Sequence, residues 1–160
     1  MRARGPLMLF TAWALHDVEE ALTFPDACDV LAARTGRSRL RMDARQSWTA
    51  VGAMGILVGA ACLRGATSNG SSRLYRAVLA GLGAHVGTHL LASVAAHRYT
   101  PGVITAVPVM GAGAWAAAHD LEREGGGLSA ADLRRGFAVL APAVIVCHVL
   151  ARLPNYARTP

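Results

Sequence analysis

The apolar residues of this chain gather into long blocks, and polar segments that carry arginine separate one block from the next. A helix of about 20 apolar residues is long enough to cross the hydrocarbon core of a bilayer. Hydrophobic residues make up 53% of the 160 residues and charged residues only 16%, whereas soluble domains carry roughly 25% charged residues. The sequence therefore predicts an all-α fold, a polytopic bundle of membrane helices that forms one domain over residues 1–160.

About five transmembrane helices are predicted, one for each apolar block. Their expected ranges are about 6–24, 47–63, 74–97, 103–118 and 136–153. The first block follows a basic start, as in a signal peptide, but no A-x-A cleavage site comes after it, so we expect it to be retained as a helix. The arginine-rich segment 25–46 is expected to be a loop with a short helix on the membrane surface, and segment 119–135 a glycine-rich loop.

The net charge of +6 comes with sixteen basic residues, all of them arginine. They flank the apolar blocks, where anionic lipid head groups lie, so the expected partner is the lipid bilayer and not nucleic acid. The heavy use of Ala, Gly and Arg is typical of a GC-rich bacterial genome, which makes the bacterial inner (cytoplasmic) membrane the expected location. Membrane orientation is not assigned, because the arginines divide equally between the two sides.

Small residues recur at the spacing that lets membrane helices approach closely. Gly55 and Gly59 form one such pair, and Gly83 and Gly87 form another. Since small side chains allow two helix backbones to come near each other in lipid, these pairs predict a tight bundle without a wide pore.

The stretch WALHDVEEALTF, residues 12–23, brings charge into the first apolar block. On a helix, His16 faces the same side as Glu19 and Glu20, whereas Asp17 points elsewhere and is expected to be solvated or to cap a helix. A carboxylate at the centre of a bilayer costs about 2.5–3.5 kcal/mol on insertion scales. Three remedies are open: a carboxyl that stays protonated, a neighbouring histidinium, or a metal ion.

Further ligands for a metal ion occur in the third and fifth blocks. His85 and His89 are four residues apart, so that both can reach one ion from a single helix turn, and His148 lies in the fifth block. The predicted metal ligands are His16, Glu19, Glu20, His85 and His89. Imidazole and carboxylate ligands suit iron, one or two ions, with manganese or zinc as alternatives.

Two motifs carry a resemblance to a known family. HDVEE at residues 16–20 and YTPG at residues 99–102 resemble the two signatures of the HXXEE family of small bacterial membrane proteins, whose general function is unassigned. The resemblance implies a shared site built from His16, Glu19, Glu20 and a histidine of the third block, either His89 or His85. It implies no reaction.

The YTPG motif has physical consequences of its own. Pro101 disfavours helix at the residue before it, and Gly102 permits a tight turn, so the motif predicts a fixed hairpin between the third and fourth helices. Tyr99 is expected at the membrane interface, either as an anchor of this turn or as a hydroxyl that closes one end of the site.

The number of ligands favours a membrane-embedded metal-dependent oxidoreductase, with non-haem iron as the first choice of metal, that acts on a lipophilic or membrane-delivered small molecule. An electron donor or partner protein is among the expected partners of such an enzyme. The expected catalytic residues are Glu19, Glu20, His148 and Tyr99. The alternatives are a metal-free acid/base isomerase or cyclase of a sterol- or prenyl-like substrate, a proton-coupled transporter, and an accessory subunit.

Overall fold

The computed structural model describes residues 4–156, and the side chains of residues 4–153. Within this range the chain forms five helices and no strand, as the hydropathy pattern predicts. The elements are α1 (Arg4–Thr35), the short 3-10 helix η1 (Ser38–Leu40), α2 (Ala44–Thr67), α3 (Arg73–Ala96), an interrupted helix made of α4 (Val103–Thr105), η2 (Ala106–Gly111) and α5 (Ala112–Arg123), and α6 (Ala130–Tyr156).

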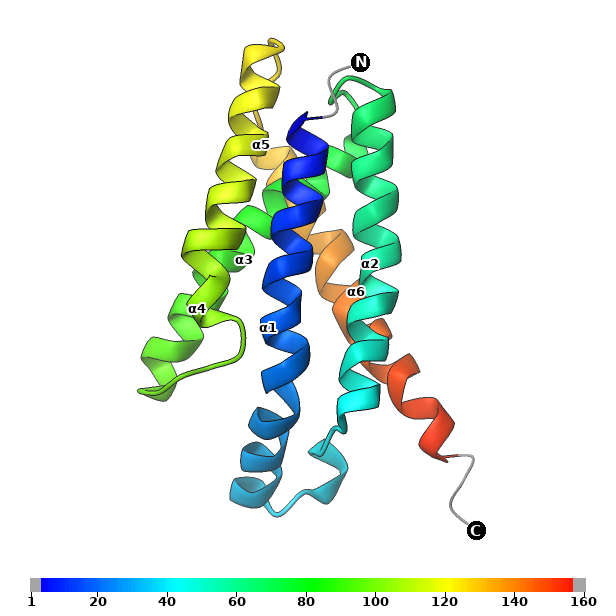
Figure 1. Cartoon of the computed structure of the whole chain (residues 1–160), viewed down its shortest axis with the longest axis vertical. Coiled ribbons are helices and arrows are strands. Elements are labelled where there is room, and N and C mark those ends of the chain that lie inside the picture. Colours follow the sequence, from blue (N-terminus) through cyan, green and yellow to red (C-terminus); the bar gives the residue numbers. More distant parts are fainter. Residues whose placement is uncertain (1–3, 157–160) are drawn as a thin grey trace.

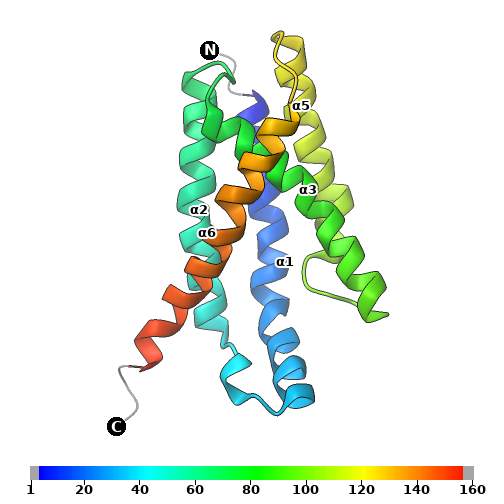
Figure 2. The same cartoon turned by 180° about the vertical axis from the view of Figure 1, so that it is seen from behind.

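The helices form two layers (Figure 1). Helix α1 lies between α2 and the interrupted helix α4–η2–α5, and it contacts both. Behind them α6 runs diagonally across α2 and α1 and crosses α3 (Figure 2). The main core lies between these layers, around the fully buried side chains of Leu9, Val58, Tyr75 and Leu79.

The predicted loop over residues 25–46 is wrong over its first part, because α1 continues through Pro25 to Thr35. Proline removes one hydrogen bond of a helix, but here tertiary packing outweighs that loss. Cys28, on the continued helix, is buried in a small second cluster with Met42, Ala50 and Ala151. The helix then gives way to Gly36, whose φ of +67° is the left-handed conformation that commonly follows a helix.

The predicted loop over 119–135 is also too long, because α5 continues to Arg123 and α6 begins at Ala130. The guanidinium of Arg76 donates to the carbonyl of Gly127 and forms an ion pair of 3.0 Å with the buried Asp132. The Asp132 carboxylate also accepts hydrogen bonds from the backbone and hydroxyl of Ser129. These contacts hold the glycine-rich connection against α3 and leave a loop of residues 124–129 only.

The fourth predicted helix, 103–118, contains a π-helical stretch at Ala106–Gly111 and extends to Arg123. Pro108 lies inside this stretch and has no N–H for the regular helical hydrogen bond. A wider turn accommodates this break, and such turns are frequent at functional sites. Here the turn directly follows Thr105, which belongs to the site described below.

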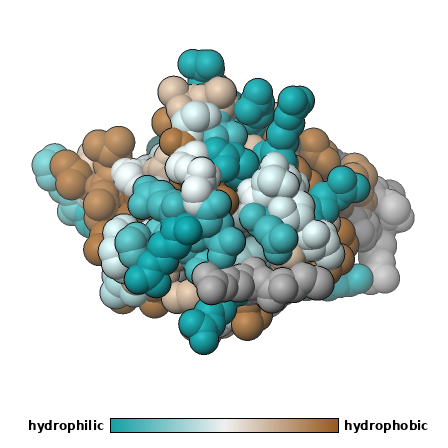
Figure 3. Space-filling view, turned by 90° about the horizontal axis from the view of Figure 1, so that it is seen from above, coloured by the Kyte–Doolittle hydropathy of each residue, from teal (hydrophilic) through white to brown (hydrophobic). Residues whose placement is uncertain are grey.

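Among residues 4–153, three helices are long and apolar enough to cross a membrane, over Ala44–Thr67, Arg73–Ala96 and Ala130–Leu153. Helix α1 is long enough, but every 18-residue stretch of it contains Glu19, Glu20 and at least one more acidic residue. The flanks of the bundle expose large apolar side chains, among them Ile56, Leu91 and Ile145. Seen from the end in Figure 3, hydrophilic residues gather over the end of the bundle and apolar residues over its flanks. This distribution is that of a protein surrounded by lipid.

The closest contacts between helices occur at glycines. Of the two predicted glycine pairs, only Gly55 and Gly59 lie at such a contact. A Cβ at Gly55 would lie 2.9 Å from the ring of Trp13 on α1, and one at Gly59 would lie 3.5 Å from Phe10. At Gly83 such a Cβ would make an ordinary contact of 3.8 Å with Cβ of Ala114, but at Gly87 no atom lies within 4 Å, so the predicted close approach is wrong at Gly87. A tight contact that the spacing did not predict joins α6 to α3, since a Cβ at Gly136 would lie 2.5 Å from the carbonyl oxygen of Ala77.

The crossing of α3 and α6 gives a test of the fold. The Gly136→Leu variant should be destabilised by about 1–3 kcal/mol, because backbone atoms of Ala77 and Gly81 block the new side chain. Thermal unfolding in detergent should show a lower midpoint for this variant. Gly87→Leu is the matched control, as open space surrounds that position. Equal midpoints for the two variants would contradict the crossing described here.

Candidate metal centre

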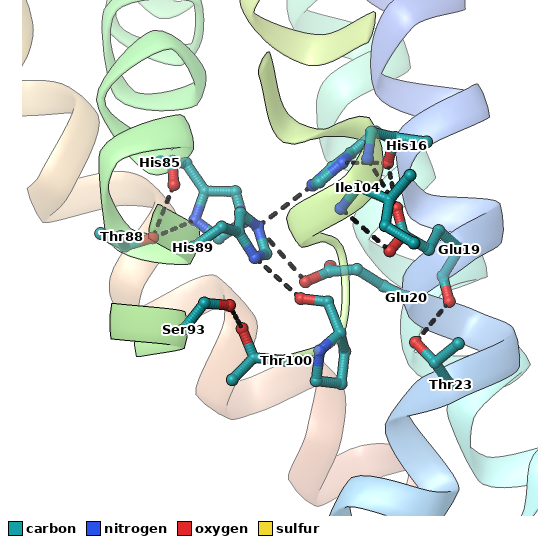
Figure 4. Close-up of polar contacts among 12 residues, drawn as sticks. His16, Glu19, Glu20, Thr23, His85, Thr88, His89, Ser93, Thr100 and Ile104 are labelled. Atoms are coloured by element: carbon teal, nitrogen blue, oxygen red, sulfur yellow. Dashed lines mark hydrogen bonds and ion pairs between the residues drawn. The ribbon is translucent and has the colours of Figure 1, made fainter. Parts of the chain in front are cut away.

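Four of the predicted site residues come together between α1 and α3 (Figure 4). They are His16, Glu20, His85 and His89, and one ligand atom from each lies within 4.8 Å of all the others. Nε2 of His89 lies 3.1 Å from Nε2 of His16 and 2.8 Å from Nε2 of His85. It also lies 3.5 Å from Oε1 of Glu20. His16 is fully buried and His89 is nearly so, whereas Glu20 and His85 are half-buried.

Helical spacing brings these side chains to one place. His16 and Glu20 are four residues apart on α1, and His85 and His89 are four residues apart on α3, so each pair occupies one face of its helix. The two faces meet where the turn of residues 99–102 folds back beside α1. Gly102 has a φ of +83°, and a Cβ there would lie 2.5 Å from Cε1 of His89 and 2.9 Å from Cε1 of His16. The glycine of the YTPG motif is therefore needed for its contact with two imidazoles as well as for the turn.

The proton positions on the three imidazoles follow from their Nδ1 partners. Nδ1 of His89 lies 2.9 Å from the carbonyl oxygen of Pro101, and a carbonyl can only accept, so this nitrogen carries a proton. The Thr105 hydroxyl donates to Oε2 of Glu19 at 2.5 Å, so Nδ1 of His16, 2.8 Å from the same hydroxyl, is the donor to it.

The proton position on His85 also follows from the partner of its Nδ1 atom. The Thr88 hydroxyl donates to the carbonyl oxygen of His85 at 2.7 Å, and it therefore accepts from Nδ1 of His85 at 3.0 Å. With a proton on each Nδ1, the Nε2 atoms of the three neutral rings carry lone pairs. All three lone pairs belong to the nitrogens that meet at the centre of the group.

Glu19, which we predicted to be a ligand, does not lie in this group. Its carboxylate accepts hydrogen bonds from the hydroxyl of Tyr99 at 2.7 Å and from the backbone N–H groups of Ile104 and Thr105 at 3.2 and 2.8 Å. The negative charge thus lies at the start of the helix that begins at Val103, where the helix dipole favours it. Glu19 fastens the turn to α1 and reaches His16 through the Thr105 hydroxyl.

Tyr99 lies outside the group of four residues, and its hydroxyl donates to Glu19. Its side chain is 45% exposed, and burial of the rest, together with the Glu19 carboxylate, raises the pKa of the phenol. The hydroxyl therefore stays protonated near neutral pH and donates to Glu19. Thr105 and Thr88 were not foreseen from the sequence. The sequence feature that could have identified Thr105 is its position in the first turn of a helix, directly after a glycine turn. The first N–H groups of a helix have no hydrogen-bond acceptor within the helix itself.

A cavity of about 480 Å³ lies next to the four residues, between α1, α2, α3 and α6. Most of its wall is apolar, but Asp17, Glu20, His85 and His148 also line it. Asp17 is only 6% exposed, so the expectation of a solvated or capping Asp17 is wrong. The Trp13 side chain lies beside its carboxyl.

His148 lies outside the group formed by the other three histidines and Glu20. Its ring stacks on Phe24 of α1, with ring centroids 5.0 Å apart and an interplanar angle of 28°. It lines the same cavity as Glu20 and His85, but it is not part of the group that could hold a metal ion. The structure thus assigns His148 to the cavity wall.

The cavity opens sideways between α3 and α6. Phe137 and Val144 of α6 line it and are 51% and 41% exposed on the outside of the bundle, and Thr88 of α3 is also exposed. Both helices are long and apolar enough to cross a membrane. The mouth therefore lies on a flank that lipid would cover.

Comparison with known proteins gives one match. The family model described as "Protein of unknown function with HXXEE motif" matches residues 7–116. This range includes the four clustered residues, Glu19 and the turn of residues 99–102, and it stops before α6. Neither the curated proteins nor the solved structures gave a match. Because the match covers more than half of the chain and includes both motifs, this chain belongs to the HXXEE family.

Proposed function

We propose that His16, Glu20, His85 and His89 hold one metal ion and that the protein is a metal-dependent membrane oxidoreductase for a lipophilic small molecule. The observation that carries the proposal is the meeting of three imidazole Nε2 atoms, each with its proton on the opposite nitrogen, beside a carboxylate. Iron is the first choice of metal, and manganese or zinc are the alternatives. The expected location is the inner membrane of a bacterium.

The short distances between the Nε2 atoms support a cation at their centre. Three lone pairs at 2.8–3.1 Å from their neighbours repel one another when no proton lies between them. A metal ion removes this repulsion, because it binds the lone pair of each neutral imidazole. Ligand bonds of about 2.0–2.2 Å place neighbouring ligand atoms roughly 3 Å apart, which is close to the observed separations.

The proposed ligands would leave coordination positions open on the metal ion. Four protein ligands leave about two positions open around a metal that prefers six ligands, whereas tetrahedral zinc would be filled. Bound iron supplies one-electron and oxygen chemistry when a suitable electron donor is present. Glu20 and His85 line the cavity as well as the centre, so a molecule in the cavity would meet the open side of the site.

The remaining residues orient the metal ligands and form the binding site for the substrate. Thr105 and the Pro101 carbonyl fix the ring orientation of His16 and His89, as outer hydrogen bonds do for metal-ligating histidines generally. The apolar wall of the cavity excludes water and favours a lipophilic substrate. The mouth between α3 and α6 supports entry from the bilayer rather than from water.

One observation favours a second candidate, an acid/base isomerase or cyclase without a metal. Asp17 and Glu20 are two carboxyl groups on the wall of one mainly apolar cavity. Such a pair can divide the roles of acid and base on a sterol- or prenyl-like substrate. This candidate does not account for the three converging imidazoles, and metal analysis separates it from the first.

The metal content of the purified protein tests the proposed centre. The protein, purified in detergent without chelators, should hold about one transition-metal ion per chain by elemental analysis, because the four ligands surround one position. Glu20→Gln, which keeps the size of the side chain, and His89→Ala should both lose most of it. His119→Ala is the control, since His119 lies near the far end of α5, stacked on Trp115.

The identity of the metal decides between the proposals. Iron would support oxidation, and binding of nitric oxide, seen as a new absorbance band, would reveal an open position. Zinc would contradict an oxidation and would support Lewis-acid chemistry at the same centre. Less than about a tenth of an ion per chain in the unmodified protein would refute the metal centre and leave the acid/base candidate.

A substitution at Thr105 tests the outer hydrogen bonds of the centre. The Thr105→Val variant keeps the shape of the side chain but removes the hydroxyl between His16 and Glu19. Metal affinity, measured by competition with a chelator, should fall by about 10–100-fold, the usual effect of losing an outer hydrogen bond to a ligand. Thr49→Val is the matched control, because the Thr49 hydroxyl bonds only within its own helix. Unchanged affinity would show that Thr105 does not orient His16.

A further inference from the structure

Two buried polar atoms on α6 lack a hydrogen-bond partner. They are Nδ1 of His148 and Nε of Arg152, the only such side-chain atoms found among residues 4–153. The two residues are four apart and therefore lie on one face of the helix. Buried polar groups in proteins are almost always hydrogen-bonded, and each exception calls for an explanation. Two exceptions on successive turns of one face point to a ligand.

The charge of the pair indicates the kind of ligand. The guanidinium of Arg152 is always positive, and none of the ion pairs found among the described residues includes it. Its Nε–H is a donor, and Nδ1 of His148 becomes a donor in one tautomer. A group that both atoms can bind is an anionic oxygen, such as that of a carboxylate or a phosphate.

The position of the pair suits a head group. In the sequence the apolar run of α6 gives out after Leu153, and Pro154, Asn155 and Arg158 follow, so Arg152 is expected at the end of the membrane-spanning segment, where head groups meet the hydrocarbon. His148 lies one turn deeper and lines the cavity. An anionic head group bound here would stay at the interface while the rest of the molecule enters the bundle.

The cavity continues from this point as an apolar slot along α6. Its lining residues on α6 run from His148 back to Gly136 and include Val144 and Leu140. Twelve residues of helix correspond to about 18 Å, so the slot is long enough for an extended hydrocarbon chain. Its volume of about 480 Å³ lies within the range of pockets for small molecules.

The metal centre lies near the head-group end of this slot. Phe24 stacks on His148, and Glu20 lies one turn before Phe24 on the same helix. We infer that the cavity binds a single-chain amphiphile whose anionic head group is held by Arg152 and His148, with its tail along α6. In this arrangement the carbons nearest the head group face the metal centre. That last part of the inference rests on the proposed function.

Binding of three labelled chains of equal length tests the inference. The full protein, in nanodiscs of zwitterionic lipid, is offered tritiated palmitate, hexadecyl phosphate or hexadecanol. One or both anionic chains should bind at least about tenfold more tightly than the alcohol, because a charge-assisted hydrogen bond is gained. The anionic chain that binds more tightly shows whether the preferred head group is a carboxylate or a phosphate.

Four variants assign the effect to its residues. Arg152→Gln should bring the anionic chains to the affinity of hexadecanol, and His148→Phe, which keeps a ring against Phe24, should weaken them in the same way. Arg45→Gln, an exposed arginine at the start of α2, should change nothing. Val144→Trp, at the cavity mouth, should weaken all three chains. Equal binding of the three chains by the unmodified protein, or an anion preference that survives in Arg152→Gln and His148→Phe, would overturn the inference.

Metal analysis of the same samples separates this inference from the proposed function. Arg152→Gln should keep its metal while it loses the anion preference, which would support both. A preference for anionic chains in protein without metal would support the head-group site and overturn the metal-dependent reaction. Full metal content with equal binding of all three chains would overturn the head-group site alone.

Discussion

The structure depends on the contact between the imidazoles of α1 and α3. His16 is completely buried, and its ring meets His89, which in turn meets His85. In an apolar bundle, polar groups at this depth are costly unless they bind one another or an ion. The position of α1 against α3, and of the 99–102 turn against both, satisfies these groups. Gly102 allows the turn to come close enough, since a side chain there would collide with two of the rings.

A second set of contacts ties the turn to the site. The Glu19 carboxylate binds Tyr99 and the first N–H groups of the helix that follows the turn, and through Thr105 it reaches Nδ1 of His16. The two carboxylates of the HxxEE motif therefore have different tasks. Glu20 joins the three histidines, and Glu19 fixes the turn and, indirectly, the orientation of His16. The π-helical stretch that follows Thr105 lets the helix continue past Pro108 without disturbing these contacts.

The cavity connects the centre with the bilayer. Helices α1, α2 and α3 supply the side that carries Asp17, Glu20 and His85, and α6 supplies the long apolar wall with His148. Because α6 crosses α3 closely at Gly136 and Gly81, the two helices diverge below the crossing (Figure 2). That divergence forms the lateral mouth, and it brings His148 and Arg152 toward the second half of α1.

Much of the fold follows from hydropathy alone. The apolar blocks predicted an all-helical chain of about five membrane helices, because the need to satisfy every backbone hydrogen bond in lipid leaves the helix as the main solution. The described residues do form five helices, three of them long and apolar enough to cross a membrane. The ends of the helices did not follow, since Pro25 and the glycine-rich loop suggested breaks that tertiary contacts override. Burial of Cys28 keeps α1 helical beyond Pro25, and the Arg76–Asp132 ion pair shortens the loop before α6.

The residues of the candidate site were also visible in the sequence, because histidines and carboxylates at helical spacing inside apolar blocks are rare and face one side of a helix. Which of them meet was decided only by the tertiary structure. His16, Glu20, His85 and His89 converge because α1 and α3 lie face to face at this level, whereas the neighbouring Glu19 is turned by the helix toward the start of α4. His148 and Asp17 became cavity residues for the same reason. The sequence by itself determines the chemical groups and the helix that carries each, and the packing angle between helices decides their partners.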